Sequence, residues 1–101
     1  MSFSNSPEKS CVQVTGGTGA IVAGSNFGVA SSLRNSAGDY TVVTNRSYSF
    51  PIITPTILSA TPGLSIGIAP NADKVTFHVT IWVGTTPTDA NFSLGFDEAI
   101  T

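Results

Sequence analysis

The feature that most constrains this chain is a run of nine residues whose side chains alternate in character. It reads Val75-Thr76-Phe77-His78-Val79-Thr80-Ile81-Trp82-Val83. Successive side chains of a β-strand point to opposite faces of a sheet, and β-branched and aromatic residues favour strands. The odd-numbered residues are all β-branched or aromatic, so we expect them to share one face and to form part of a hydrophobic core.

Shorter alternating runs predict further strands, and helical periodicity is almost absent. A turn-forming stretch at residues 35–39 predicts a hairpin between residues 26–34 and 40–44. A loop at residues 85–90 leads to residues 91–96, which we expect to be the antiparallel partner of the nine-residue run. The remaining expected strands are residues 12–14, 20–23, 50–59 and 64–68.

Proline and glycine refine the interpretation of two segments. Pro51 and Pro55 cannot donate hydrogen bonds to a ladder, so we expect residues 50–59 at a sheet edge or at a bulge. The sequence Gly16-Gly17-Thr18-Gly19 is typical of a flexible turn. It lacks the Lys-Ser/Thr of a phosphate-binding loop, and no helix is expected after it.

These strands predict the fold class. About seven or eight short strands in a chain of 101 residues indicate an all-β fold, an antiparallel two-sheet sandwich of jelly-roll-like kind. No linker or internal repeat divides the sequence, so a single domain is expected over residues 1–101. Within it, we expect residues 1–25 to form an N-terminal arm with the first strands, and residues 26–96 to form the main sandwich.

Charge is scarce in this chain. Only 10% of the residues are charged, against about 25% in ordinary soluble domains, and thirteen Ser and thirteen Thr supply neutral polarity instead. Four basic residues and a net charge of −2 disfavour a nucleic-acid partner, and no run approaches the roughly 20 apolar residues of a membrane span. Because the cores of protein interfaces are poor in charge, this composition favours assembly with other protein chains.

Neither a cofactor nor a metal site is expected. Cys11 is the only cysteine and His78 the only histidine, so no zinc-binding spacing exists. As a catalytic base, His78 would need a Ser or Thr hydroxyl beside it and an acid such as Asp73 or Asp97 to orient it. Nothing in the sequence places such a trio together, so we favour a hydrogen-bonded strand histidine at the surface or at an interface.

The acidic residues mostly fall at expected turns or near the C-terminal end. Asp39 and Asp73 are expected to accept hydrogen bonds from nearby backbone amides. The pair Asp97-Glu98, with Asp89 across the expected last hairpin, comes closest to a site for a hard cation. Calcium-loop spacing is absent, so we favour turn and surface roles for these acids.

Trp82 raises a separate question, because it falls on the even-numbered face with Thr76, His78 and Thr80. A tryptophan is large and costly to leave exposed without a purpose. Three explanations remain open: packing under a local loop, a subunit interface, and a platform on which a carbohydrate stacks.

Several segments together resemble a known group of proteins. They are residues 28–33 (GVASSL), a turn, residues 38–43 (GDYTVV), a proline-containing strand, the nine-residue run and residues 92–96 (FSLGF). This arrangement is similar to the small β-sandwich domains of bacteriophage virion appendages, which include tail-fibre tips, head fibres and capsid decoration proteins. The resemblance implies a jelly-roll-like protomer that forms trimers.

The main functional hypothesis is a non-enzymatic capsid decoration, or cement, protein on the capsid surface of a virion. It would be a homotrimer that binds and stabilises the shell of the major capsid protein. Residues 1–25 contain no coiled-coil, collagen-like or β-helical repeat, so a free-standing protein is expected rather than the tip of a shaft. The candidate interface residues are Val12, Val14, Tyr48, Phe50, His78 and Trp82.

The alternative hypothesis is a tail-fibre or head-fibre tip that binds a receptor or a glycan on the host surface. In that case the loops of residues 35–39 and 85–90 would contact the receptor. Its candidate residues are Asn35, Asp39, Thr86 and Asp89. A third class, a small hydrolase or lyase, would require His78 or the acidic residues to converge on one site.

Overall fold

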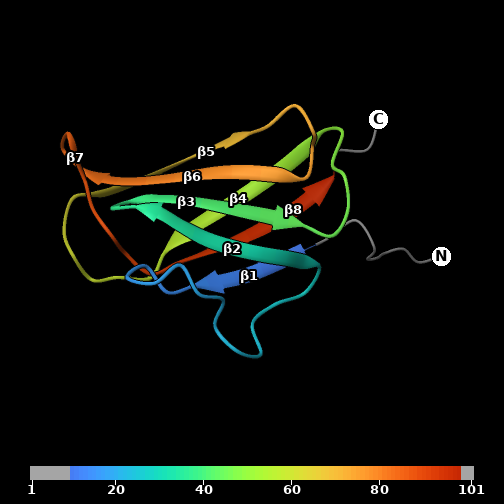
Figure 1. Cartoon of the computed structure of the whole chain (residues 1–101). Coiled ribbons are helices and arrows are strands. Elements are labelled where there is room, and N and C mark those ends of the chain that lie inside the picture. Colours follow the sequence, from blue (N-terminus) through green and yellow to red (C-terminus); the bar gives the residue numbers. More distant parts are fainter. Residues whose placement is uncertain (1–9, 99–101) are drawn as a thin grey trace.

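A computed structural model describes residues 10–98 of the chain as eight β-strands in two antiparallel sheets (Figure 1). The strands are β1 (Ser10–Val14), β2 (Val29–Ser36), β3 (Asp39–Thr44), β4 (Pro51–Ile57), β5 (Leu64–Pro70), β6 (Thr76–Val83), β7 (Thr86–Pro87) and β8 (Phe92–Glu98). The three-stranded sheet has the order β1-β8-β4. The five-stranded sheet has the order β2-β3-β6-β5, with the short β7 paired to β6. The expected all-β, two-sheet sandwich is confirmed.

Eight residues of the nine-residue run form β6, Thr76–Val83, and they alternate as expected. Phe77, Val79 and Ile81 are buried in the core, whereas His78 is exposed on the outer face of the five-stranded sheet. β6 pairs with β3 on one side and with β5 on the other. β6 is therefore a central strand, and its inner residues pack against the three-stranded sheet, as in the contact of Phe77 with Phe96, which explains why its pattern is the clearest.

The core is the layer of side chains between the two sheets. Phe77 of the five-stranded sheet and Phe96 of the three-stranded sheet have ring centroids 4.8 Å apart, and Tyr40 and Phe92 form a second such pair at 4.9 Å. Tilted aromatic pairs at this spacing add to the free energy gained from burying apolar area. These contacts hold the sheets face to face (Figure 1).

The first expected hairpin is confirmed, and the second is wrong. β2 and β3 pair antiparallel around the turn that contains Gly38. Residues 92–98, in contrast, do not pair with β6. They form β8 at the centre of the three-stranded sheet, and the chain crosses between the sheets in the loop that precedes β8. Alternation showed that both segments are strands with one buried face, but it could not show that the sides of β6 are occupied by β3, β5 and β7.

β4 lies at an edge of the three-stranded sheet, where its prolines were expected to place it. Pro51 and Pro55 both belong to this strand, and β8 is its only partner within that sheet among the described residues. An edge strand needs ladder hydrogen bonds on one side only, so it tolerates residues without an N–H group.

The opposite edge of this sheet is β1, and the loop after β1 folds back along it. The amide N–H of Cys11 donates to the carbonyl oxygen of Phe27, and the reverse bond is also formed, both at 2.9 Å. The strand expected at residues 20–23 is wrong, because this segment forms only one isolated bridge, from Ile21 to β1. The loop therefore satisfies the edge of β1 without forming a regular strand.

The glycine-rich turn after β1 is confirmed as a turn, but two of its three glycines are required by close packing. A Cβ atom on Gly16 would lie 2.3 Å from the carbonyl oxygen of Ala90, and one on Gly19 would lie 2.4 Å from the amide nitrogen of Arg34. Such distances are far inside van der Waals contact. The backbone of this turn therefore packs directly against the loop that precedes β8 and against β2, whereas the sequence alone suggested flexibility.

The expected N-terminal arm is described from Ser10 onward, and its first nine residues lie outside the described part, as do residues 99–101. From Ser10 the chain enters β1 and is already part of the sandwich. Among residues 10–98, no helix is long and apolar enough to cross a membrane.

Candidate functional site

Asp89 follows β7 and holds together a network that we call the Asp89 cluster. Its carboxylate oxygens accept hydrogen bonds from Nε of Arg34 at 3.0 and 3.1 Å, and Nη2 of Arg34 lies 2.8 Å from Oδ2. Oδ1 also accepts from the Tyr40 hydroxyl and from the amide of Gly38, both at 2.9 Å. The Tyr40 hydroxyl in turn lies 2.8 Å from the carbonyl oxygen of Gly16. Asp89, a candidate receptor residue, is thus occupied by contacts inside its own chain.

The pKa values in the Asp89 cluster follow from these contacts. The hydrogen bond from Arg34 lowers the pKa of Asp89 below its ordinary value despite partial burial, and the same contact raises the pKa of Arg34. Burial, together with the neighbouring carboxylate, raises the pKa of Tyr40 to about 12. At neutral pH the cluster therefore contains an ionised acid, a charged guanidinium and a protonated phenol that donates to the acid.

A second acidic group, Asp39, lies on the outer face of the five-stranded sheet beside His78. Nε2 of His78 is hydrogen-bonded to Oδ1 of Asp39, and the Asn35 amide donates to the same oxygen at 3.3 Å. β3 and β6 are neighbours, so these side chains meet across the ladder. The acid beside the histidine is therefore Asp39, and neither Asp73 nor Asp97 orients the ring as we had considered.

The His78 pair does not extend to a nucleophile in the part of the chain that the structure describes. Among residues 10–98, no Ser or Thr hydroxyl is hydrogen-bonded to His78, whose side chain is 45% exposed. A catalytic serine or threonine needs a base within hydrogen-bond distance. The geometry instead matches the expected hydrogen-bonded strand histidine at the surface.

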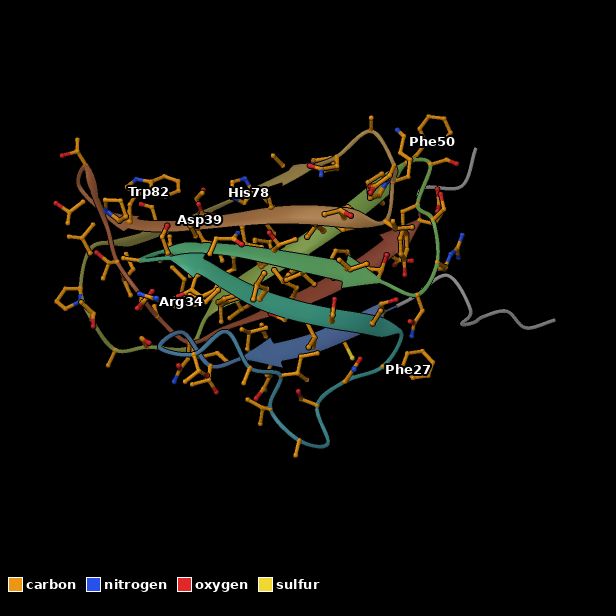
Figure 2. All side chains as sticks on the ribbon, viewed as in Figure 1. Phe27, Arg34, Asp39, Phe50, His78 and Trp82 are labelled. Atoms are coloured by element: carbon orange, nitrogen blue, oxygen red, sulfur yellow. The ribbon has the colours of Figure 1, made fainter. Side chains whose placement is uncertain are left out.

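Trp82 lies on the same outer face, and Figure 2 shows it beside His78 above β6. Its side chain is half-buried and borders a depression of about 210 Å³, which we call the Trp82 depression. The depression lies between the β2–β3 turn and the β6–β7 hairpin, so both predicted receptor loops contribute to it. Its lining residues are Ser36, Ala37, Gly38, Asp39, Thr80, Ile81, Trp82 and Pro87.

The outer face of the three-stranded sheet has a different character. The outward residues of its central strand β8 include Ser93 and Gly95, which are small, so a shallow trough runs along β8 between β1 and β4. Two adjoining hollows of about 340 and 330 Å³ make up this β8 trough, and Cys11, Thr54 and Gly95 line both of them. Asp97, at one end, is the only charged residue that lines the trough in the described part of the chain.

Large apolar side chains project around the β8 trough. Phe27 and Ile52 line the larger hollow and are 60% and 52% exposed. Phe27 lies on the side of the molecule away from His78 and Trp82 (Figure 2). A trough that is poor in charge and bordered by exposed apolar groups is typical of a surface that another protein covers.

The structure separates the six candidate interface residues into two groups. Val12, Val14 and Tyr48 are buried in the core of the chain, so they offer no side-chain surface and are wrong as interface anchors. Alternation in β1 points its valines inward, and Tyr48 packs against aromatic rings of both sheets. The other three candidates reach the surface: Phe50 is 63% exposed, His78 is exposed, and Trp82 is half-buried.

The remaining acids have mainly local roles. Asp73 accepts hydrogen bonds from the amides of Val75 and Thr76 and from the Thr76 hydroxyl, which confirms its expected turn role and lowers its pKa. Glu98 pairs with Arg46 at 3.4 Å and accepts a hydrogen bond from the amide of Phe50. Within residues 10–98, no group of His, Cys, Asp and Glu side chains is arranged to hold a metal ion. Asp89 lies before β8 and Asp97 near its far end, so they do not converge as considered.

Of the candidate receptor residues, Asn35 and Thr86 are exposed, Asp39 borders the Trp82 depression, and Asp89 belongs to its own cluster. The residues around the β8 trough were not singled out from the sequence. Phe27 and Ile52 lie in segments whose pairing was not known, and Gly95 is informative only once β8 is seen at the centre of a sheet. The signal available in the sequence was Gly95, a small residue in the middle of an alternating strand, where it leaves a hollow on the sheet.

Comparison with models of protein families, with curated proteins and with solved structures finds no match to this chain.

Proposed function

We propose that this chain is a non-enzymatic structural protein of a bacteriophage virion, a homotrimeric decoration protein on the shell of the major capsid protein. The observation that carries the proposal is the β8 trough, a large outer face bordered by exposed apolar residues. The sequence resemblance described above suggests the virion, the trimer and the capsid as its setting. In this proposal, neighbouring copies of the chain cover the trough.

Desolvation favours this use of the three-stranded sheet. The residues that line the trough are apolar or carry neutral polar side chains, apart from Asp97 at one end. Covering such a surface removes apolar area from water and strips few ions of their hydration. The same face carries both a hollow and projecting groups such as Phe27, so one copy can fill the hollow of the next.

Charged groups elsewhere in the protomer are largely occupied by contacts within the chain. Arg34 is bound to Asp89, Arg46 to Glu98, and the Lys74 ammonium to the carbonyl oxygen of Ser49 at 3.3 Å. These contacts bind the side chains of Arg34, Arg46 and Lys74 within their own chain. Assembly through the trough would therefore break none of these ion pairs.

The expected mechanism of stabilisation is binding linkage. A trimer that contacts several capsid subunits at once binds the assembled shell and not the separated subunits. A ligand that binds only one state stabilises that state by a free energy that grows with the logarithm of its concentration relative to its Kd. Particles that lack the protein should consequently withstand less heat and less osmotic shock.

Gly95→Lys is the sharpest test, because Gly95 lies in the middle of the trough. A Cβ atom there would meet nothing nearer than 3.9 Å, so the fold of the protomer should tolerate the substitution. The long charged side chain would stand where a neighbour must pack. Native mass spectrometry should show a trimer for the unmodified protein and a monomer for Gly95→Lys. Leu33→Lys is the matched control, since Leu33 is 61% exposed on the other sheet.

Cys11 gives an independent readout, as the single cysteine of the chain and an exposed residue of the trough. Its thiol should react slowly with a maleimide in the assembled protein and rapidly in Gly95→Lys. Co-sedimentation with capsids, followed by counting copies per particle, tests the remaining part of the proposal. Hundreds of copies agree with decoration, whereas a few dozen would indicate a fibre. A stable monomer that binds no particle would overturn the proposal.

A further inference from the structure

Trp82 is the only tryptophan in the chain, and its position on the five-stranded sheet is defined by a glycine on the neighbouring strand. A Cβ atom on Gly67 of β5 would lie 3.3 and 3.4 Å from two carbons of the six-membered ring of Trp82. The ring thus lies over Gly67 and rests against the sheet in the space that a side chain would occupy. This contact holds the indole in place and leaves it half-buried.

Polar groups surround the Trp82 depression next to the indole. The carboxylate of Asp39 is the charged group among them, and His78 and Asn35 both bind its Oδ1. Oδ2 of Asp39 has no hydrogen-bond partner among residues 10–98 and so remains available as an acceptor. Ser36 and Thr80 also line the depression, and each carries a hydroxyl group.

We propose that the Trp82 depression binds one neutral pyranose unit of a glycan, with an apolar face of the sugar ring on Trp82 and a pair of its hydroxyl groups on Asp39. A sugar ring has C–H bonds on its faces and hydroxyl groups on its edge, so it needs an aromatic surface beside hydrogen-bond acceptors. The depression supplies both side by side. This site goes beyond the proposed function, because it lies on the five-stranded sheet and leaves the β8 trough unused.

The size of the depression favours a single ring. Its volume of about 210 Å³ is below the roughly 300–1,000 Å³ of sites that enclose drug-sized ligands. Its walls are two turns, the β2–β3 turn and the β6–β7 hairpin, which leaves room for the rest of a glycan to extend into solvent. We therefore expect weak binding of a monosaccharide and stronger binding of an array that presents many copies.

The charges favour a neutral sugar over an acidic one. Partial burial raises the pKa of Asp39, but hydrogen bonds from His78 and Asn35 outweigh this and keep its pKa below the ordinary value, so the carboxylate is ionised at neutral pH. The nearest guanidinium, that of Arg34, is held by Asp89. A sialic acid or a uronic acid would thus meet a negative charge, and no Lys or Arg is among the described residues that line the depression.

The test uses the fluorescence of the chain itself, since Trp82 is its only tryptophan. The intact protein is titrated with methyl glycosides of galactose, glucose and mannose and with sialic acid, each to about 100 mM, because weak single-sugar sites fall in the millimolar range. We expect a saturable change in emission with at least one neutral glycoside and none with sialic acid. A glycan array probed with the labelled protein should show the same selectivity.

Three variants test whether a fluorescence or array response comes from the Trp82 depression. Asp39→Ala should weaken binding by about tenfold, because it removes a charged acceptor of hydrogen bonds. Gly67→Ala should also weaken it, because the added methyl group displaces the indole. Trp82→Ala, followed on the array, should abolish binding. Leu33→Ala is the matched control, since Leu33 is a 61% exposed apolar residue of the same sheet that does not line the depression, and binding by this variant should be unchanged.

Two results would overturn the proposal. One is the absence of any saturable response to neutral glycosides together with an empty array. The other is binding that survives in Trp82→Ala, which would place the sugar elsewhere. If Trp82 emission changes only when capsids are added, a protein partner covers the depression, and the sugar site is rejected while the proposed structural function stands. Conversely, glycan binding by a protein that remains monomeric would support this site and reject the trimer.

Discussion

Asp39 and Asp89 lie close together in the fold, and each accepts hydrogen bonds from a basic side chain, yet their surroundings differ. Asp89 binds Arg34, the Tyr40 hydroxyl and a backbone amide of the β2–β3 turn. Asp39 binds only the side chains of His78 and Asn35, and one of its carboxylate oxygens has no partner among residues 10–98. The sequence predicted the same receptor role for both acids.

The two acids differ in the free energy that would be lost if their hydrogen-bond donors were left without an acceptor. Gly38 is buried and its amide donates to Asp89, and the completely buried Tyr40 covers the same place, so water cannot replace Asp89 without opening the end of the sandwich. The partners of Asp39 are exposed, and water can solvate them. A buried donor left without an acceptor costs far more than an exposed one. Asp89 therefore stabilises the fold, and Asp39 remains available to a ligand.

Gly16→Ala should have the largest effect on stability, because it acts on the backbone that the Asp89 cluster encloses. The new methyl group would overlap the backbone of Ala90, which cannot rotate out of the way as a side chain can. Overpacking of this kind reaches about 3 kcal/mol or more. Urea unfolding at a fixed protein concentration measures it. Gly17→Ala is the control, since an added Cβ at Gly17 meets nothing within 4 Å, and an equal loss in the two variants would contradict the packing argument.

Asp89→Ala should rank next, with a loss of about 1.5–3 kcal/mol in the free energy of unfolding, as expected for hydrogen bonds to a charged group. The substitution removes the acceptor of the Gly38 amide and the ion pair of Arg34, and it leaves the carbonyl oxygen of Gly16 as the remaining acceptor of the Tyr40 hydroxyl. Thermal unfolding followed by circular dichroism is the measurement. A loss of only a few tenths of a kcal/mol, typical of an exposed ion pair, would mean that the cluster is a surface feature.

Much of the fold could be predicted from the sequence, because the strongest signals are local. The alternation in β6, the turn between β2 and β3, and the prolines of β4 each depend on the residue itself and its near neighbours. The place of β8 could not be predicted in this way. Which strand it joins depends on the contacts of Phe92 and Phe96 across the sandwich, and these involve residues far away in the chain.

The candidate sites were harder to predict for the same reason. Trp82 and Asp39 were each noted, but their common depression exists only because β3, β6 and β7 are neighbours. The contacts of Asp89 could not be predicted, since its partners lie 49 to 55 positions away in the sequence. Val12 and Tyr48 were mistaken because an apolar residue looks alike in sequence whether it faces the core or a partner.

Acid should weaken the fold, and Asp89 should account for part of the loss. The pKa values of Asp39, Asp73 and Asp89 are all lowered in the folded chain. The unfolded state therefore binds more protons below the ordinary aspartate pKa of about 3.9, so stability is complete above that pH and is lost as the pH falls through the folded values. Urea titrations between neutral pH and about pH 3 give the slope. Asp89→Asn should have a shallower slope than the unmodified protein, and an unchanged slope would mean that Asp89 is not specifically stabilised.

Asp39→Asn should have the smallest effect on stability, within about 0.5 kcal/mol, because the amide keeps the shape of the side chain and its partners stay in contact with water. The same variant should nevertheless reduce the affinity of the Trp82 depression for a neutral sugar, since the amide is a weaker acceptor than the carboxylate and one of its two terminal atoms now donates. Urea unfolding and the fluorescence titration, performed on one preparation, separate the two effects. A loss of stability as large as that of Asp89→Ala would show that Asp39 also holds the fold together, and the contrast between the two acids would be wrong. A small loss with weakened binding would leave Asp89 as the structural acid of this end of the sandwich and Asp39 as the one that contacts a ligand.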